Sequence, residues 1–426
     1  MKGTGGAAVF ACAQLVTGRK VLRDVVVEVS GGVLTRIGTD PAPGAAVRLG
    51  TVVPGIRNAH SHAFHRLLRG RTHVGGGDFW RWREAMYAAA AELTPDRYER
   101  LATEVYREMR DAGYTSVSEF HYVHHRQGGT PYADHDMERA LAAAARVAGI
   151  RLVLLDACYL SGGIGEPLRG VQQRFGDGTA RAWLDRWHRL REALAPDADR
   201  PGEPGVVVGA AVHSVRAVAR DALAEIAAGL PGETPLHVHV SEQPAENEAC
   251  LRAYGLTPTG LLAESGLLAE RTSLVHATHL TEADIALIAD AAATVVMCPT
   301  TEADLGDGIG PAPELAAAGV PLRIGSDQHA VIDPWEELAR LESDQRLRLG
   351  RRGVFTPAQL WAAGGGALEI GQPFDAVELD TETSRTRGAD AWQLPLVARS
   401  GDVRATIVGG IVHRADAGSL AAEVHA

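Results

Sequence analysis

Eight short apolar segments, separated by amphipathic stretches, occupy the middle of the chain. Each segment is rich in β-type apolar residues and reaches polar residues at its end. They cover residues 51–62, 115–122, 151–159, 205–214, 235–242, 272–279, 294–302 and 321–329. Near-continuous apolar runs are typical of parallel strands that are buried on both faces. The pattern therefore predicts a series of eight buried parallel strands.

The stretches between these segments carry signals for helix starts. Thr94 and Pro95 open an amphipathic stretch that runs to Asp111, with a hydroxyl at the N-cap and proline in the first turn. Thr281 and Asp284 have the spacing of a capping box, with Asp in place of the usual Glu. Eight strand–helix units in this order favour an α/β fold of the (β/α)8 TIM-barrel type. We expect residues 51–359 to form this barrel.

The two ends of the chain have a different pattern. Residues 7–47 and 374–414 contain short apolar strands joined by turns, and no helical stretch follows them. Gly409 and Gly410 have the composition of a hairpin turn. We expect residues 1–50 and 360–426 to form one small β-sandwich domain built from both chain termini.

Composition excludes several classes of protein. The net charge is −11 and no dense basic cluster occurs, so we expect no nucleic-acid partner. No run of 18 or more apolar residues is present, so we expect no membrane span. The four cysteines are scattered, without the spacing of a zinc knot or a disulfide scaffold, which favours a cytoplasmic location.

Polar side chains gather at the carboxyl ends of the predicted strands. In a (β/α)8 barrel these ends converge on one mouth, so residues far apart in the sequence become neighbours there. In chain order they are His60, His62, Glu119, His121, Asp156, His213, His239, Glu242, His276, Glu302 and Asp327. We expect an active site among them and structural roles for a minority.

The pair His60 and His62 indicates a metal site. The two residues are two apart on a strand, so their side chains point to the same face and can chelate one ion. Catalytic zinc sites usually combine three protein ligands with a water molecule. His239, His276 and Asp327 offer further ligands, or a proton acceptor, from other strands. His237 has the same parity as His239, but it lies one layer deeper and is better interpreted as a histidine of the barrel core.

Several motifs resemble those of the amidohydrolase superfamily. They are PGIRNAHSHAF (54–64), HVSE (239–242), LVHATH (274–279) and GSD (325–327). Within it, DFWRWREAMY (78–87), GYTSVSEFHYVHH (113–125) and CPTTEADLGDG (298–308) are most similar to the formimidoylglutamate deiminase family. The resemblance covers roughly residues 50–350. It implies hydrolysis of N-formimino-L-glutamate to N-formyl-L-glutamate and ammonia, a step of histidine degradation.

The resemblance also implies a set of ligands and catalytic groups. One Zn²⁺ would be held by His60, His62, His239 and Asp327, with iron or manganese as other metals that such ligands accept. Two-metal members of the superfamily bridge their ions with a lysine, and this chain has no lysine after Lys20. A single ion is therefore expected. The catalytic residues implied are Glu242 as the proton shuttle, His276 as the group that positions the attacking water, and Asp327 as a proton acceptor.

By the same resemblance, a substrate pocket is expected near the metal. Its residues would be His65, Arg83, Tyr122, His213 and Arg216. Arginine binds planar carboxylates well, so the expected substrate is a small acidic molecule. Arg81 is the alternative to Arg83, since both lie in the stretch WRWR. The family usually has glutamine at the position of His65, and imidazole differs in shape and can titrate. A substrate other than N-formimino-L-glutamate therefore remains an alternative.

Two other interpretations of the site remain. The first is the same chemistry on another amidine, formimino compound or aminated heterocycle. The second is a non-catalytic metal-binding barrel. Arg83, Arg216 and Tyr122 favour an acidic, acyclic substrate, and the complete set of ligands together with Glu242 favours an enzyme. The resemblance further implies a homodimer.

Overall fold

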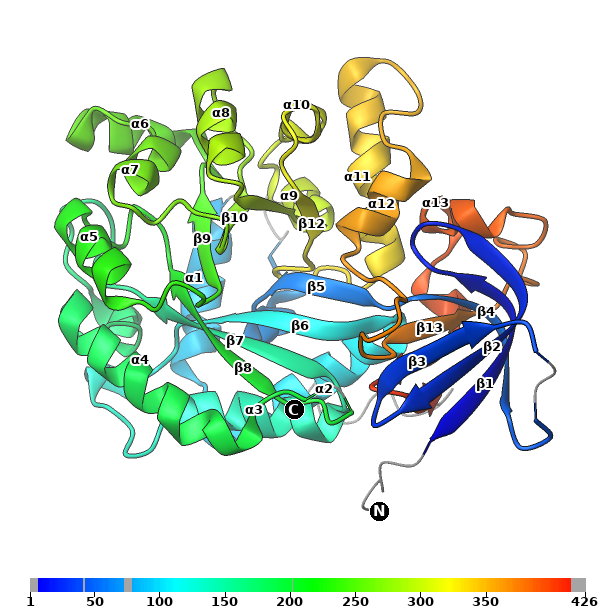
Figure 1. Cartoon of the computed structure of the whole chain (residues 1–426). Helices are drawn as coiled ribbons and strands as arrows, with labels where there is room; N and C mark the ends of the chain where they lie inside the picture. Colours follow the sequence, from blue (N-terminus) through cyan, green and yellow to red (C-terminus); the bar gives the residue numbers. More distant parts are fainter. Residues whose placement is uncertain (1–6, 41–42, 73–78, 201, 415–426) are drawn as a thin grey trace.

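Eight parallel strands form a nearly closed barrel (Figure 1). The structure, a computed structural model, describes residues 7–40, 43–72, 79–200 and 202–414. Consecutive strands pair in parallel, from the first to the last. The strands are β5 (Ile56–Ser61), β6 (Tyr114–His121), β7 (Arg151–Cys158), β8 (Val206–Val212), β9 (Leu236–Val240), β10 (Thr272–His276), β11 (Thr294–Met297) and β12 (Leu322–Ile324). The predicted (β/α)8 fold is confirmed.

Helices connect the strands and cover the outside of the barrel (Figure 1). The larger ones are α1 (Phe79–Ala91), α2 (Pro95–Ala112), α3 (Asp136–Ala148), α4 (Ala180–Leu194), α5 (Arg220–Gly229), α6 (Pro244–Tyr254), α8 (Glu282–Asp290) and α11 (Pro334–Leu349). Shorter ones are η1 (Ala63–Leu68), α7 (Pro258–Glu264), α9 (Pro299–Leu305), α10 (Ala312–Ala317), α12 (Pro357–Ala363) and α13 (Leu394–Val397). Both predicted helix starts are confirmed: Thr94 caps α2, and Thr281 with Asp284 forms a capping box on α8. Within the described residues, no helix has the length and apolar character that crossing a membrane would require.

Strands from both chain ends form a second, seven-stranded sheet, which lies to the right of the barrel in Figure 1. Its core includes Phe10, Val27, Phe374 and Ile407, all buried. The predicted hairpin turn at Gly409 and Gly410 joins its last two strands. In sheet order the strands are β15 (Ile411–Arg414), β14 (Val403–Val408), β13 (Ala376–Leu379), β4 (Val47–Pro54), β1 (Ala8–Val16), β2 (Val21–Ser30) and β3 (Val33–Gly38). The expected β unit from both termini is confirmed.

The first apolar run, 51–62, contributes to both sheets instead of forming one strand. Its first half belongs to β4, and its second half is β5, the first strand of the barrel. The break falls at Pro54 and Gly55. A Cβ atom on Gly55 would lie 2.3 Å from Cγ2 of Thr115, so glycine allows the close approach of the chain to β6 at this point. Because the run is apolar on both sides of the break, its periodicity did not reveal the change of sheet.

Candidate functional site

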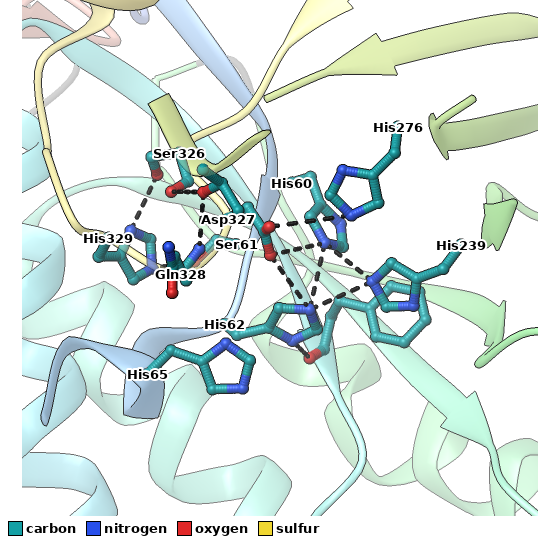
Figure 2. A network of polar contacts seen from close by, with 12 residues as sticks. His60, Ser61, His62, His65, His239, His276, Ser326, Asp327, Gln328 and His329 are labelled. Atoms are coloured by element: carbon teal, nitrogen blue, oxygen red, sulfur yellow. Dashed lines mark hydrogen bonds and ion pairs between the residues drawn. The ribbon is translucent and has the colours of Figure 1, made fainter. Parts of the chain in front are cut away.

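Four donor atoms converge at the carboxyl ends of three strands (Figure 2). The Nε2 atom of His60 lies 3.1 Å from Nε2 of His62 and 3.1 Å from Nε2 of His239, and the latter two are 3.3 Å apart. Oδ1 of Asp327 lies 3.3 Å from Nε2 of His60 and 3.5 Å from Nε2 of His62. All four side chains are buried. The structure thus brings the four predicted ligands together from β5, β9 and the segment after β12.

Hydrogen bonds at the far side of two rings define which nitrogen faces the cluster. Nδ1 of His62 lies 2.8 Å from the carbonyl oxygen of Phe120, and Nδ1 of His239 lies 2.9 Å from that of His213. A carbonyl oxygen only accepts, so each Nδ1 carries the proton and each Nε2 presents a lone pair. Burial, reinforced by the neighbouring His60, lowers the pKa of His62 to about 3. Neutral rings whose lone pairs face one another need a cation between them.

The spacing of the donors fits a tetrahedral divalent cation. Zinc binds histidine nitrogen at about 2.0–2.1 Å, and tetrahedral ligands at that radius lie about 3.3 Å apart. The separations of 3.1 to 3.5 Å among the donor atoms agree with that edge. Three imidazoles and one carboxylate are also ligand types that zinc prefers. The residues present therefore fit the group that the resemblance implies.

His276 and Glu242 stand beside this cluster. Nε2 of His276 lies 3.8 Å from Oδ2 of Asp327 and 3.9 Å from Oε1 of Glu242, and its Nδ1 lies 3.5 Å from Oε1 of Glu302. Burial by itself lowers the pKa of His276, but the nearby carboxylates of Glu242, Glu302 and Asp327 raise it to about 10. His276 also has a left-handed backbone, with φ +69°, as strained residues at functional sites often do. It is placed to donate toward both carboxylates.

Arg216 links Glu242 to a second carboxylate that the sequence did not reveal. Its Nη2 lies 3.3 Å from Oε2 of Glu242, and its Nε lies 3.7 Å from Oε1 of Glu246. Glu246 is buried in α6, one helical turn after Glu242, and it accepts a hydrogen bond from the Glu242 amide at 3.3 Å. The i, i+4 spacing of the two glutamates was the only signal in the sequence. The pair of carboxylates fixes the guanidinium at the cavity wall.

A cavity of about 370 Å³ lies over the cluster. All five predicted substrate residues line it: His65, Arg83, Tyr122, His213 and Arg216. Its walls also include aromatic side chains that sequence reasoning did not single out: Trp82, Tyr87, Tyr159 and Phe175. Nε of Arg83 donates to the hydroxyl of Tyr87 at 2.6 Å, and Nη2 donates to the carbonyl of Gly162 at 3.2 Å. The side chain of Arg81, the alternative to Arg83, lies outside the described residues.

His65 lines the cavity next to the cluster of candidate ligands, but its Nε2 atom contacts Tyr122. Its Nε2 is 2.9 Å from the hydroxyl of Tyr122, and its ring lies 4.5 Å from that of His62. His62, His65 and Asp327 also form a group with donor atoms within 4.8 Å of one another. His65 therefore lines the cavity in contact with Tyr122, and its role in substrate binding stays a prediction.

Some polar residues at the strand ends face away from the mouth. Phe120 points inward and packs against His60 and His62, so Glu119 and His121, on either side of it, point outward. Glu119 accepts hydrogen bonds from the Ser61 hydroxyl at 2.5 Å and the Ala63 amide at 2.7 Å, and burial raises its pKa to about 7. These outward residues are the structural minority that we expected.

Two other polar groups near the strand ends also lie outside the cluster. Asp156 is bound by Arg186, at 2.7 and 2.9 Å, and by the indole of Trp183 at 2.9 Å. His237 is buried, with its pKa lowered by burial to about 3, and it belongs to no candidate metal group among the described residues. Both positions agree with roles in the barrel wall or core.

Comparisons with known sequences and structures identify relatives of this chain. Residues 51–412 match the model of the amidohydrolase family. The chain is 40% identical over 371 residues to formimidoylglutamate deiminase of Pseudomonas aeruginosa, covering 83% of this chain and 80% of that protein. It is 29% identical to 8-oxoguanine deaminase of the same organism, covering 75% of this chain and 70% of the relative. The crystal structure of an amidohydrolase from Brucella melitensis is 33% identical, with a TM-score of 0.86 over 95% of this chain and 94% of the other.

Proposed function

Because the chain belongs to the amidohydrolase family and is a homologue of formimidoylglutamate deiminase, we propose that it hydrolyses N-formimino-L-glutamate to N-formyl-L-glutamate and ammonia. The observation that carries this proposal is the cavity in which two arginines line the wall above a cluster of three histidines and an aspartate. That arrangement combines a hydrolytic centre with binding groups for an acidic substrate.

The metal site consists of His60, His62, His239 and Asp327 and holds one zinc ion. When bound, such an ion lowers the pKa of a water molecule toward about 7, which supplies a nucleophile without strong base. The missing lysine supports a single ion, since no residue after Lys20 can form a carbamate bridge. The neutral, converging Nε2 atoms support the same assignment.

Asp327, Glu242 and His276 transfer protons or donate hydrogen bonds during the reaction. In the reaction, the oxygen of water bonds to the formimino carbon and the bond to the terminal nitrogen breaks. Both protons of the water end on that nitrogen, which leaves as ammonia. Asp327 and Glu242 both lie near His276 Nε2, at 3.8 and 3.9 Å, so Asp327 can receive a proton from the water and Glu242 can deliver one to the leaving nitrogen. His276 donates a hydrogen bond toward the oxygen on which negative charge develops.

The two arginines and His65 recognise the substrate. Arg83 and Arg216 each present a guanidinium to the cavity, which suits a substrate with two carboxylates. His65 and Tyr122 hold each other at 2.9 Å and bring a ring nitrogen and a hydroxyl to the same wall. Nδ1 of His65 is buried and makes no hydrogen bond among the described residues.

Replacing Arg83 with methionine is expected to raise KM for N-formimino-L-glutamate with a smaller effect on kcat. A hydrogen bond to a charged group contributes about 1.5–3 kcal/mol, which corresponds to an increase of about 10- to 100-fold. Steady-state assays of ammonia release measure both constants. Arg252→Met is the matched control, because Arg252 is an exposed arginine of α6, outside the cavity lining. An unchanged KM in Arg83→Met would exclude Arg83 from substrate binding.

A substrate panel tests the proposed function itself. The zinc-loaded protein is assayed for ammonia release from N-formimino-L-glutamate, N-formimino-L-aspartate, N-formiminoglycine and 8-oxoguanine. We expect the highest kcat/KM with N-formimino-L-glutamate, because its two carboxylates match the two arginines that line the cavity. A higher value with an uncharged heterocycle would favour the deaminase alternative. Release from none of them would favour a non-catalytic barrel.

The homodimer and the cytoplasmic location stay predictions. The homodimer follows from the resemblance, and sedimentation equilibrium would measure it. A cytoplasmic location is in keeping with four cysteines that are all buried and unpaired, and fractionation of the cells would test it.

A further inference from the structure

His329 lies beside the candidate ligands, where the first and last strands of the barrel meet (Figure 2). Its ring is fully buried and reaches two serines. Nε2 lies 3.1 Å from Oγ of Ser61, and Nδ1 lies 3.0 Å from Oγ of Ser326. Ser61 stands between His60 and His62, and Ser326 directly precedes Asp327. One ring thus connects the two segments that carry three of the four candidate ligands.

When Glu119 is ionised, the hydrogen bonds around this ring have one consistent direction. Oδ1 of Asn58 accepts from the Ser326 amide at 3.0 Å, so Nδ2 of Asn58 donates to the Ser326 hydroxyl at 2.6 Å. That hydroxyl then donates to Nδ1 of His329. On the other side, the Ser61 hydroxyl donates to the Glu119 carboxylate at 2.5 Å and accepts from Nε2 of His329. Every donor finds an acceptor when His329 is neutral and carries its proton on Nε2.

The backbone of His329 is held by a neighbour as well as its ring. Nη1 of Arg66 donates to the His329 carbonyl at 2.5 Å, which holds the backbone of the same residue. Ring and backbone of His329 are therefore both fixed by neighbours.

The link lies just beyond the short last strand of the barrel. Strand β12 spans only Leu322–Ile324, and Asp327 lies beyond its end. There Asp327 exchanges two backbone hydrogen bonds with β5, one from the His62 amide and one to the His60 carbonyl, each 3.0 Å long. Asp327 and His329 have φ angles of +43° and +59°, a left-handed conformation that costs free energy in residues other than glycine. Such a segment keeps its shape only if its surroundings hold it.

We propose that His329 is a positioning residue for the metal site. By bridging Ser61 and Ser326, the ring fixes the end of β5 against the segment that carries Asp327. The carboxylate then stays at the distance from His60 and His62 that a divalent cation requires. His329 belongs to none of the candidate metal groups of the described residues, and its contacts are to Ser61 and Ser326, so it acts through the neighbours of the ligands. The inference rests on the metal site of the proposed function.

The test compares zinc affinities, measured by competition with a chromogenic chelator. His329→Phe keeps a ring of similar size but removes both hydrogen bonds. We expect it to weaken zinc binding by about 10- to 100-fold, the usual effect of removing a group that orients a metal ligand. The absorption bands of the cobalt-substituted protein should change as well, since they report ligand geometry. His329→Gln, which keeps a donor and an acceptor, should recover part of the affinity.

Two further variants separate positioning from general stability. Leu190→Ala removes a buried side chain of α4 and should lower Tm without weakening zinc binding. Ser326→Ala removes one half of the bridge and gives the same comparison if His329→Phe does not fold. In the double variant the two changes should be less than additive, because they break the same link.

The possible outcomes test separately the role of His329, the metal site and the proposed substrate. A His329→Phe protein that binds zinc as tightly as the unmodified chain would overturn the role of His329. An unmodified chain that binds no zinc would overturn both the site and this inference. An unmodified chain that binds zinc but releases no ammonia from N-formimino-L-glutamate would overturn the proposed substrate alone, and the affinities would still decide on His329.

Discussion

Glu242→Gln should lower kcat by about 10²- to 10⁴-fold, the usual contribution of a positioned proton-transfer group. Glutamine has nearly the same shape as glutamate, but it cannot accept and deliver a proton. Oε1 of Glu242 lies 3.9 Å from Nε2 of His276, beside the cluster of candidate ligands. Because Glu242 is not among those ligands, the metal content should not change. Steady-state ammonia release and metal analysis on the same preparation measure both quantities.

The matched control for this variant is Glu248→Gln. Glu248 lies on α6, and its side chain is 66% exposed, so the same loss of charge occurs away from the cavity. We expect kcat of this control to equal that of the unmodified protein. A Glu242→Gln protein with full activity would remove Glu242 from the proposed mechanism.

His239→Asn should lose both the metal and the activity. The change removes one of three nitrogen donors that lie 3.1 to 3.3 Å from one another, and the shorter asparagine cannot reach their common point. We expect less than one equivalent of metal after dialysis and ammonia release at background level. Metal analysis and the activity assay, before and after addition of zinc, provide the measurement.

His237→Asn is the control on the same strand. His237 has the same parity as His239 and is also buried, but it stands two residues earlier on β9. This variant should keep one equivalent of metal even if its stability falls. Loss of metal in His237→Asn, with retention in His239→Asn, would show that the ligand had been assigned to the wrong histidine.

Much of the fold follows from the sequence because a parallel barrel has a simple pattern. Each buried strand is a short apolar run, and helix caps such as Thr94 and the pair Thr281 and Asp284 mark where the helices begin. The change of sheet at Gly55 could not be predicted in this way. It depends on the close approach of the chain to Thr115, a contact between residues that are distant in the sequence.

The candidate site, like the fold, could be predicted from the sequence only in part. Parity placed His60 and His62 on one face, and the convergence of strand ends brought in His239 and Asp327. Parity also shows that Glu119 and His121 share a face, but one sequence alone does not reveal whether that face is inside or outside. The inward packing of Phe120 against the histidines decides it.

Residues that act through a neighbouring residue are the hardest to predict from the sequence. Glu246 supports Arg216, and the i, i+4 spacing from Glu242 was its only signal; His329 joins Ser61 to Ser326, and no spacing pattern indicates that role. Arg216 lies 30 residues from Glu246, and Ser61 lies 268 residues from His329, so these contacts form only when the barrel closes.

The most direct test is anomalous X-ray diffraction from crystals of the zinc-loaded protein, recorded on both sides of the zinc absorption edge. One anomalous peak per chain is predicted, about 2.0–2.2 Å from Nε2 of His60, His62 and His239 and from a carboxylate oxygen of Asp327. A second peak of equal height in the cavity, a single peak away from these four side chains, or no peak would contradict a one-metal site.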